Sequence, residues 1–275
     1  MRAPLLALLL LFLGLGAWQL AATPGHTAAP ALDPEYAALV GAATAGGGRT
    51  PFPTPAEIAV RLGHLLAHPF YDNGPNDKGI GIQLGTSLLR VAGGFLLAAL
   101  VAIPLGFAVG MSPLLNAVIN PYIQVLRPVS PLAWMPLALY TIRDSAASAI
   151  FVIFICALWP MLLNTAFGVA GVKREWRNVA RTLEAGFWKT ATRVILPAAA
   201  PTILTGMRIS LGIAWLVIVA VEMLVGGTGI GYWVWNQWNN LSLADIVIAI
   251  LLIGLVGLLL DRLLGAAGRL VAWQE

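Results

Sequence analysis

Charged residues are scarce in this chain. Only 10% of its 275 residues are Asp, Glu, Lys or Arg, whereas a soluble globular protein carries about 25%. Hydrophobic residues make up 59%, and mean hydropathy is +0.84. These values indicate a polytopic membrane protein. The net charge of +4 does not indicate nucleic-acid binding, because the basic residues lie beside long apolar runs.

Cysteine is nearly absent as well. Cys156 is the single cysteine and stands inside an apolar run, so the chain can form no internal disulfide and no cysteine-based metal site. His64 and His68 share a predicted helix face, but no nearby group completes a ligand set. We therefore expect no metal site, and a small buried apolar role for the cysteine.

Catalytic motifs are also missing. The chain has no G-x-x-x-x-G-K-[ST], no G-x-S-x-G and no H-E-x-x-H. We therefore expect a subunit that is not an enzyme and holds no cofactor. Any energy from ATP must then enter through a partner.

Long apolar runs predict an all-α membrane protein with about six transmembrane helices. The first, residues 1–22, fits either a signal peptide or a retained span, and we expect the span. Residues 23–83 hold many prolines and should form an external loop, with a short amphipathic helix starting at Thr54-Pro55-Ala56-Glu57. The remaining runs cover residues 84–111, 116–142, 145–168, 202–225 and 243–264, within a core of 84–271.

The third predicted span is interrupted by Arg127-Pro128-Val129-Ser130-Pro131. Broken backbone at membrane depth is tolerated only inside protein or along a watery cavity. Arg127 follows a charge-free run that begins at residue 91, so its guanidinium needs a carboxylate, a cavity or an anion. Both a structural ion pair and a substrate pathway containing Arg127, Trp134 and Glu222 remain open.

Other charges in the spans have less specific interpretations. Arg90 should extend outward to the interface, and Glu222 should pair with an arginine or form part of an outer gate. Asp261 and Arg262 should form a local pair. Aromatic and sulfur-containing side chains in the spans are expected to be core packing: Trp134, Met135, Trp159, Trp215 and Met223. Outside the spans, an aromatic belt is expected at Tyr232, Trp233, Trp235 and Trp238.

A basic segment separates the fourth and fifth predicted spans. Residues 173–208 hold seven of the sixteen Lys and Arg residues, which places this loop, and with it both termini, in the cytoplasm. The pattern predicts a helix with an apolar stripe of Ala180, Leu183, Phe187 and Trp188, with breaks expected at Gly186, Pro197 and Pro201. The stripe could lie on lipid or dock in a groove of a cytoplasmic protein.

This segment resembles the cytoplasmic "EAA" loop of ABC importer permeases. Val194-Ile195-Leu196-Pro197 matches the end of that pattern. Asn178-Val179-Ala180 stands where E-A-A is expected, and Glu184 occupies the usual glycine position, so that Gly186 would do that glycine's work. The resemblance implies a coupling loop at 173–201 that contacts an ATPase. Its contact residues would be Arg177, Ala180, Arg181, Leu183, Glu184, Gly186, Phe187, Trp188 and Pro197.

The resemblance extends over about residues 84–271. The runs at 87–100, 126–142, 151–169 and 206–243 are similar to permeases of nitrate, nitrite, cyanate and bicarbonate importers, with taurine and alkanesulfonate permeases close to them. It implies a type I ABC importer permease fold and a bacterial cytoplasmic membrane location. The implied partners are a second permease copy, two ATPase subunits that bind ATP and Mg, an external solute-binding protein and the lipid bilayer.

We therefore expect import of a small oxyanion, nitrate first, by alternating access. A taurine or sulfonate importer is the alternative within the class. An ion channel, a secondary transporter and a structural scaffold are alternatives outside it. Channels and scaffolds have no need of a basic amphipathic loop that ends in V-I-L-P, and the absence of a convincing internal repeat disfavours an inverted-repeat secondary transporter.

Overall fold

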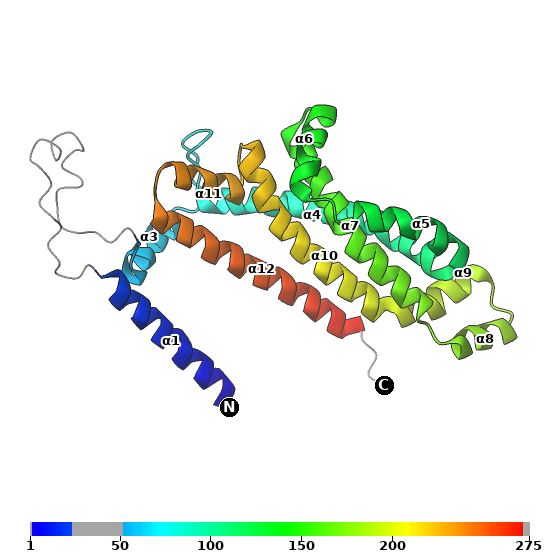
Figure 1. Ribbon diagram of the computed structural model, residues 1–275. Helices are drawn as coiled ribbons and strands as arrows, with labels where there is room; N and C mark the ends of the chain where they lie inside the picture. The colour runs from blue at the N-terminus through cyan, green and yellow to red at the C-terminus, as the bar shows by residue number, and fades with distance from the viewer. Residues whose placement is uncertain (1, 24–51, 272–275) are drawn as a thin grey trace, which may run out of the picture. The chain divides into compact units, whose positions relative to one another are not determined.

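The computed structural model describes residues 2–23 and 52–271. Every named element in these ranges is helical, which confirms the predicted all-α class. Residues 24–51 of the predicted external loop lie outside the described residues. Figure 1 labels α1 (Arg2–Ala22), α3 (Pro55–Ala67), α4 (Ile80–Met111), α5 (Pro113–Leu126), α6 (Pro131–Ile142), α7 (Ser145–Ala170), α8 (Arg174–Thr182), α9 (Phe187–Thr190), α10 (Leu196–Val225), α11 (Ile230–Asn239) and α12 (Leu243–Val271).

The chain forms two compact units, and each is described by itself. The smaller unit comprises residues 1–69 and 236–251. In it α3 begins with a capping box, since the side chain of Thr54 accepts from the amide of Glu57 and the Glu57 carboxylate accepts from the Thr54 amide. Arg61 of α3 donates to the buried carboxylate of Asp245 at 2.8 Å. The predicted helix start is thus present, and an ion pair holds α3 to the start of α12.

Four helical segments of the described chain are long and apolar enough to cross a membrane: 80–111, 145–170, 187–225 and 243–268. The third predicted span is instead two short helices, α5 and α6, of 14 and 12 residues. At 1.5 Å per residue neither covers a hydrocarbon core of about 30 Å. They meet at residues 127–130, so the break predicted from the prolines is present.

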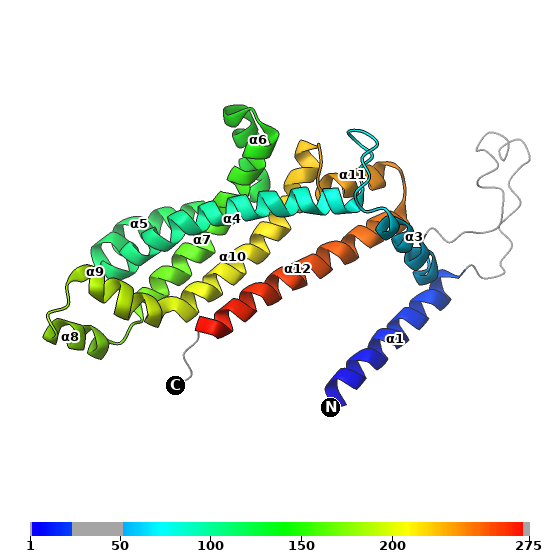
Figure 2. The same cartoon turned by 180° about the vertical axis from the view of Figure 1, so that it is seen from behind.

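The larger unit, residues 70–235 and 252–275, is built on α4, α7 and α10, which lie side by side in Figures 1 and 2. Glycines allow the close approach. A Cβ on Gly106 or Gly110 of α4 would lie 2.6 or 2.5 Å from a carbonyl oxygen of α7, and one on Gly206 of α10 would lie 2.5 Å from the Asn164 Cβ. Small residues at such spacings are typical of packed membrane helices.

The start of the fifth span differs from the prediction. Pro197 and Pro201 do not end the helix as predicted: Pro197 lies in the first turn of α10, and Pro201 lies inside α10, where it cannot donate a backbone hydrogen bond. A π-helical stretch, η1 (Ala191–Ile195), joins α9 to α10. The apolar segment therefore runs without interruption from Phe187 to Val225.

Candidate functional site

A cavity of about 420 Å³ lies beside the break between α5 and α6. Arg127 and Trp134 line it from the broken segment, Trp159 and Asn164 from α7, and Ile213 from α10. Arg127 supplies a fixed positive charge, and Asn164 adds an amide whose nitrogen donates to the Pro160 carbonyl at 2.8 Å. The arrangement offers a cation and polar groups between aromatic walls, which suits a small anion.

The cavity residues were only partly found from the sequence. Arg127 and Trp134 were assigned together to a substrate pathway, and the structure brings them together. Trp159 was assigned to core packing, yet it lines the cavity, and Asn164 was missed. The sequence does distinguish Asn164, because it is a lone amide side chain between two apolar runs, 151–163 and 166–169.

Arg127 has no carboxylate partner among the ion pairs of residues 52–271. The acidic side chains of α10 and α12 are taken by other arginines, since Glu222 pairs with Arg90, Asp245 with Arg61 and Asp261 with Arg208. The structural pair with Glu222 that the sequence left open is therefore not formed. The guanidinium of Arg127 therefore lines the cavity without a carboxylate partner among the described residues.

Glu222 belongs to a separate buried network. Its carboxylate is 1% exposed and lies 2.8 Å from Arg90, which does not extend outward as predicted. Ser87 donates to both Glu222 oxygens at 2.8 and 2.9 Å, and the Gly231 amide donates to the same carboxylate at 3.0 Å. Glu222 therefore pairs with an arginine, one of the two roles expected for it, and it is not among the residues that line the Arg127 cavity.

The same network holds the loop between α10 and α11. The Gly229 amide donates to Gln83 at 2.6 Å, the Ile230 amide donates to Ser87 at 2.9 Å, and Arg90 donates to the Thr228 carbonyl at 2.6 Å. Gly229 has φ +154, and a Cβ there would lie 2.2 Å from the Glu222 carboxyl carbon. Side chains of α4 thus fix the backbone of three successive residues, Thr228 to Ile230.

Two further predictions are corrected by long-range packing. Asp261 pairs with Arg208 of α10 and not with its neighbour Arg262, because successive residues of a helix point to different faces. Trp233, expected in an aromatic belt, is buried at 5% exposure inside α11. Trp215 is core, as predicted, and its indole donates to the Ile253 carbonyl at 2.9 Å.

The basic loop contains α8, which is tied to the end of α7. Arg177 donates to the Val169 carbonyl at 2.5 Å, and Ala180 is buried. Exposed on α8 and the following turn are Trp176, Val179 and Leu183, the last at 74%. Arg181 is exposed too. Arg177 and Ala180 thus anchor α8, while the other side chains offer a mixed basic and apolar surface.

The end of α8 shows the backbone conformation of Glu184, which stands at the usual glycine position of the EAA pattern. The Ala185 amide donates to the Ala180 carbonyl at 3.0 Å and the Glu184 amide to the Arg181 carbonyl at 2.9 Å, which is a Schellman cap. Its left-handed position belongs to Glu184, with φ 52. Gly186, with φ −59, does not take over that role as predicted. A glutamate therefore holds a conformation that glycine adopts more readily.

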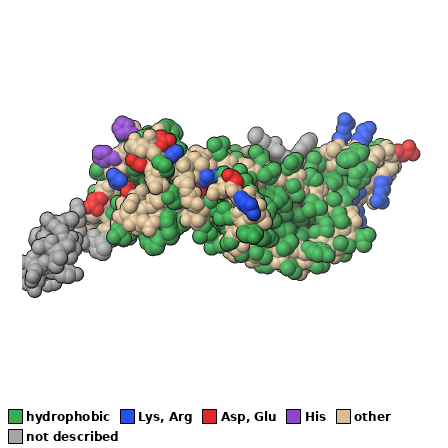
Figure 3. Space-filling model, turned by 90° about the horizontal axis from the view of Figure 1, so that it is seen from above, with side chains coloured by type: hydrophobic (Ala, Val, Ile, Leu, Met, Phe, Trp, Pro, Cys, Tyr) green, Lys and Arg blue, Asp and Glu red, His purple; other side chains and the backbone are tan. Residues whose placement is uncertain are grey.

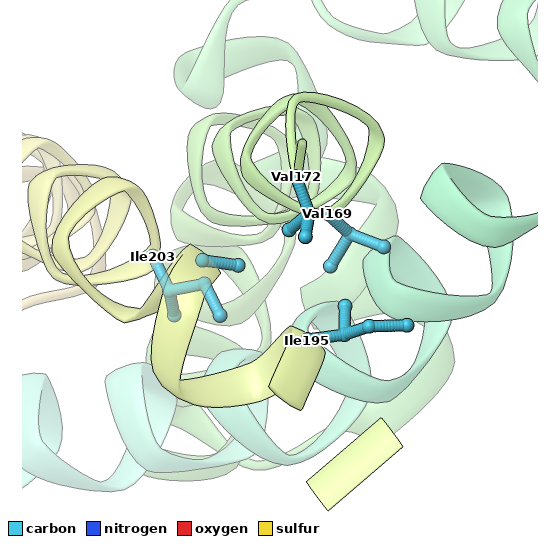
Figure 4. Close-up of a cluster of buried hydrophobic side chains, with 5 residues drawn as sticks. Val169, Val172, Ile195 and Ile203 are labelled. Atoms are coloured by element: carbon cyan, nitrogen blue, oxygen red, sulfur yellow. The ribbon is translucent and has the colours of Figure 1, made fainter. Parts of the chain in front are cut away.

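The predicted apolar stripe is divided between elements. Leu183 lies in the turn after α8, whereas Phe187 and Trp188 begin α9 and line a separate apolar groove against α4. The stripe is therefore not one face of a single helix, because the cap at Glu184 reverses the chain direction. Figure 4 shows the cluster that fixes the return into α10, with Val169 and Val172 packed near Ile195 and Ile203.

Residues 94–272 match the family described as "Binding-protein-dependent transport system inner membrane component". The chain is 45% identical over 223 residues to the nitrate import permease protein NrtB of Synechocystis, with 81% of each chain covered. It is 44% identical over 233 residues to the bicarbonate transport system permease protein CmpB of Synechococcus elongatus, covering 84% of this chain and 81% of that one.

A solved structure of the MetNI methionine ABC transporter, in an inward-facing conformation, has a similar fold. The TM-score is 0.60 at 14% identity, with 69% of this chain and 94% of that chain covered. The likeness concerns the fold alone. It covers most of the solved chain, so the helical core described above has the same arrangement in both.

Proposed function

Because this chain belongs to the family of binding-protein-dependent transport system inner membrane components, we propose that it imports a small oxyanion, nitrate first, through the Arg127 cavity. The chain is a permease subunit of an ABC importer. Its nitrate and bicarbonate permease relatives are named for planar, singly charged oxyanions, whose chemistry suits a guanidinium between tryptophan walls.

The observation that carries the proposal is the unneutralised charge of Arg127. Each carboxylate of α10 and α12 is paired with another arginine, and Arg127 lines a cavity between the broken helix, α7 and α10. A permanent cation at membrane depth is costly without a counter-charge. An anion that enters the cavity offsets this cost. The guanidinium in turn offsets part of the free energy that the anion loses when it leaves its hydration shell.

Bicarbonate is the second candidate. Relatives named for nitrate and for bicarbonate import match this chain at nearly equal identity, 45% and 44%. A guanidinium can donate hydrogen bonds to either anion, so Arg127 does not by itself select nitrate over bicarbonate. An external solute-binding protein would then supply part of the selectivity.

Energy for transport would come from two partner ATPase subunits that bind ATP and Mg, since this chain holds no P-loop motif. They would dock on the exposed surface of α8 and its turn, formed by Trp176, Val179 and Leu183. Two permease copies would move between inward-facing and outward-facing states as the ATPases close. Arg177 and Ala180, which tie α8 to the core, would transmit that motion.

Uptake in a cell that expresses the whole importer tests the function. Labelled nitrate uptake should be reduced by excess nitrate, less by bicarbonate, and not by taurine. Arg127→Gln should lower uptake by about tenfold or more, the value of one lost hydrogen bond to a charged group, while ATPase copurification is retained. Arg262→Gln, an exposed control on α12, should transport normally. Undiminished uptake by Arg127→Gln would refute the site, and competition by taurine alone would refute the substrate class.

A further inference from the structure

An apolar groove of about 390 Å³ lies between the last turns of α4 and the start of the α9–α10 segment. Phe107 and Met111 of α4 form part of one wall, and Phe187 and Trp188 part of the other. Thr192 carries the one lining hydroxyl, which donates to the Trp188 carbonyl at 2.7 Å. The groove therefore offers a hydrocarbon surface with its hydroxyl already satisfied.

Both walls of the groove belong to segments that qualify as membrane spans, 80–111 and 187–225. Phe187 and Trp188 nevertheless remain 61% and 78% exposed. Ile103, Phe107 and Met111 also pack against the buried cluster at Val169 and Ile195, so the floor of the groove is part of the core. The open side faces whatever surrounds the spans at this depth.

Two cations stand next to groove-lining residues in the sequence. Lys189 and Arg193 directly follow the lining residues Trp188 and Thr192, and both are exposed. Neither belongs to an ion pair in the part of the chain that the structure describes. Figure 3 shows Lys and Arg side chains gathered at the end where Figure 1 places α8 and α9, next to a broad hydrophobic surface.

We propose that this groove binds an anionic phospholipid, with an acyl chain against Phe107, Met111 and Trp188 and the phosphate at Lys189 and Arg193. The combination of an apolar slot between spans, an interfacial tryptophan and two free cations matches lipid headgroup recognition beside transmembrane helices. A docked protein is less well matched, because the indole N–H of Trp188 is the one side-chain donor that the lining leaves for it, beside the Thr192 hydroxyl that already donates to Trp188. The inference goes beyond the transport function, which requires no bound lipid.

Native mass spectrometry of the purified whole importer tests the site. The complex is delipidated and titrated with phosphatidylglycerol or, separately, with zwitterionic phosphatidylcholine. The double variant Lys189→Gln/Arg193→Gln should bind phosphatidylglycerol about 10- to 30-fold more weakly, as expected for two lost charges near an anionic surface, with phosphatidylcholine binding unchanged. Ala108→Phe fills the slot, since Ala108 lines it, and should weaken both lipids. Arg262→Gln is the matched control for a lost exposed cation.

Phosphatidylglycerol binding unaltered in the double variant and in Ala108→Phe would overturn the proposal. Loss of the ATPase subunits from the double variant, with lipid binding retained, would also overturn it by assigning the surface to protein docking. Failure of the transport tests at Arg127 leaves these titrations intact, because they measure lipid binding and not uptake.

Discussion

At the scale of single residues, Glu184 has a backbone conformation that is unfavourable for a residue with a side chain. Its φ of 52 lies in the left-handed region, which costs a residue with a Cβ roughly 1–2 kcal/mol. The Schellman cap of α8 requires this conformation. The chain therefore forms this cap with a residue that stabilises the left-handed conformation less than glycine does.

Glu184→Gly should stabilise the loop by about 1 kcal/mol, less the entropy that glycine loses on folding. Native-state hydrogen exchange at the amides of 180–185 measures the local opening free energy and should show slower exchange. Gly186→Ala is the control, since φ is −59 and a Cβ there meets nothing within 4 Å. Faster exchange in Glu184→Gly would contradict the assignment of strain.

The buried pair of Arg90 and Glu222 leads to a second residue-scale prediction. Arg90→Gln leaves the Glu222 carboxylate, 1% exposed, without its counter-charge, which should destabilise the protein by about 3–5 kcal/mol. Adding Glu222→Gln should restore part of this loss. Thermal unfolding of the detergent-solubilised protein measures the effect, and equal loss in the single and double variants would argue against a coupled pair.

At the scale of elements, α4 packs closely against α7 through complementary shape. Gly106 and Gly110 lie four residues apart on α4, and each faces an α7 carbonyl oxygen that a Cβ would contact at 2.6 or 2.5 Å. Such contacts give membrane helices packing energy that the hydrophobic effect does not supply between spans. The α4–α7 contact is therefore sensitive to side-chain volume at these two positions.

Gly110→Val should separate α4 from α7 and cost about 1–3 kcal/mol, the usual range for overpacking. Gly85→Val on the same helix is the matched control, because a Cβ at Gly85 meets nothing within 4 Å. Thermal unfolding and yield of folded protein report the difference. Equal stability of the two variants would show that close approach at Gly110 is not required.

The α8 element also carries a prediction about assembly. Leu183 is 74% exposed in the turn after α8, so Leu183→Asp should leave the permease folded. If this turn fills a groove of the ATPase, the change buries an unpaired charge and should weaken association by several kcal/mol, about 3–5. Copurification of the ATPase measures it, with Thr182→Asp, also exposed, as the neighbouring control. Normal yield with Leu183→Asp would move the docking surface elsewhere.

At the scale of the whole molecule, the distribution of charge predicts sidedness. Seven basic residues between 173 and 208 predict that the α8 loop and both termini lie in the cytoplasm. In a Cys156→Ala background, an impermeant thiol reagent should label a cysteine at Pro75 from outside and one at Thr182 only after lysis. Both positions are exposed. The reverse pattern would invert the topology.

Local features were predictable from the sequence because they depend on nearest neighbours. The capping box at Thr54 and Glu57, the helix break at Arg127–Pro131 and the apolar spans follow from backbone chemistry and from periodicity within about one or two turns. The family resemblance rested on the same local patterns. Arg127 was identified as a candidate site residue because a charge beside two prolines in an apolar run is unusual, whatever the tertiary structure.

The tertiary structure decided which charged residues form ion pairs with one another. Arg90 and Glu222 are 132 residues apart, Arg61 and Asp245 are 184 apart, and Arg208 and Asp261 are 53 apart. Each pairing depends on the rotation and depth of one helix against another, which residue spacing within a helix does not specify. The same packing paired Glu222 with Arg90 and brought Trp159 and Asn164 to the cavity that Arg127 lines. It left Arg127 without a carboxylate partner in the described residues.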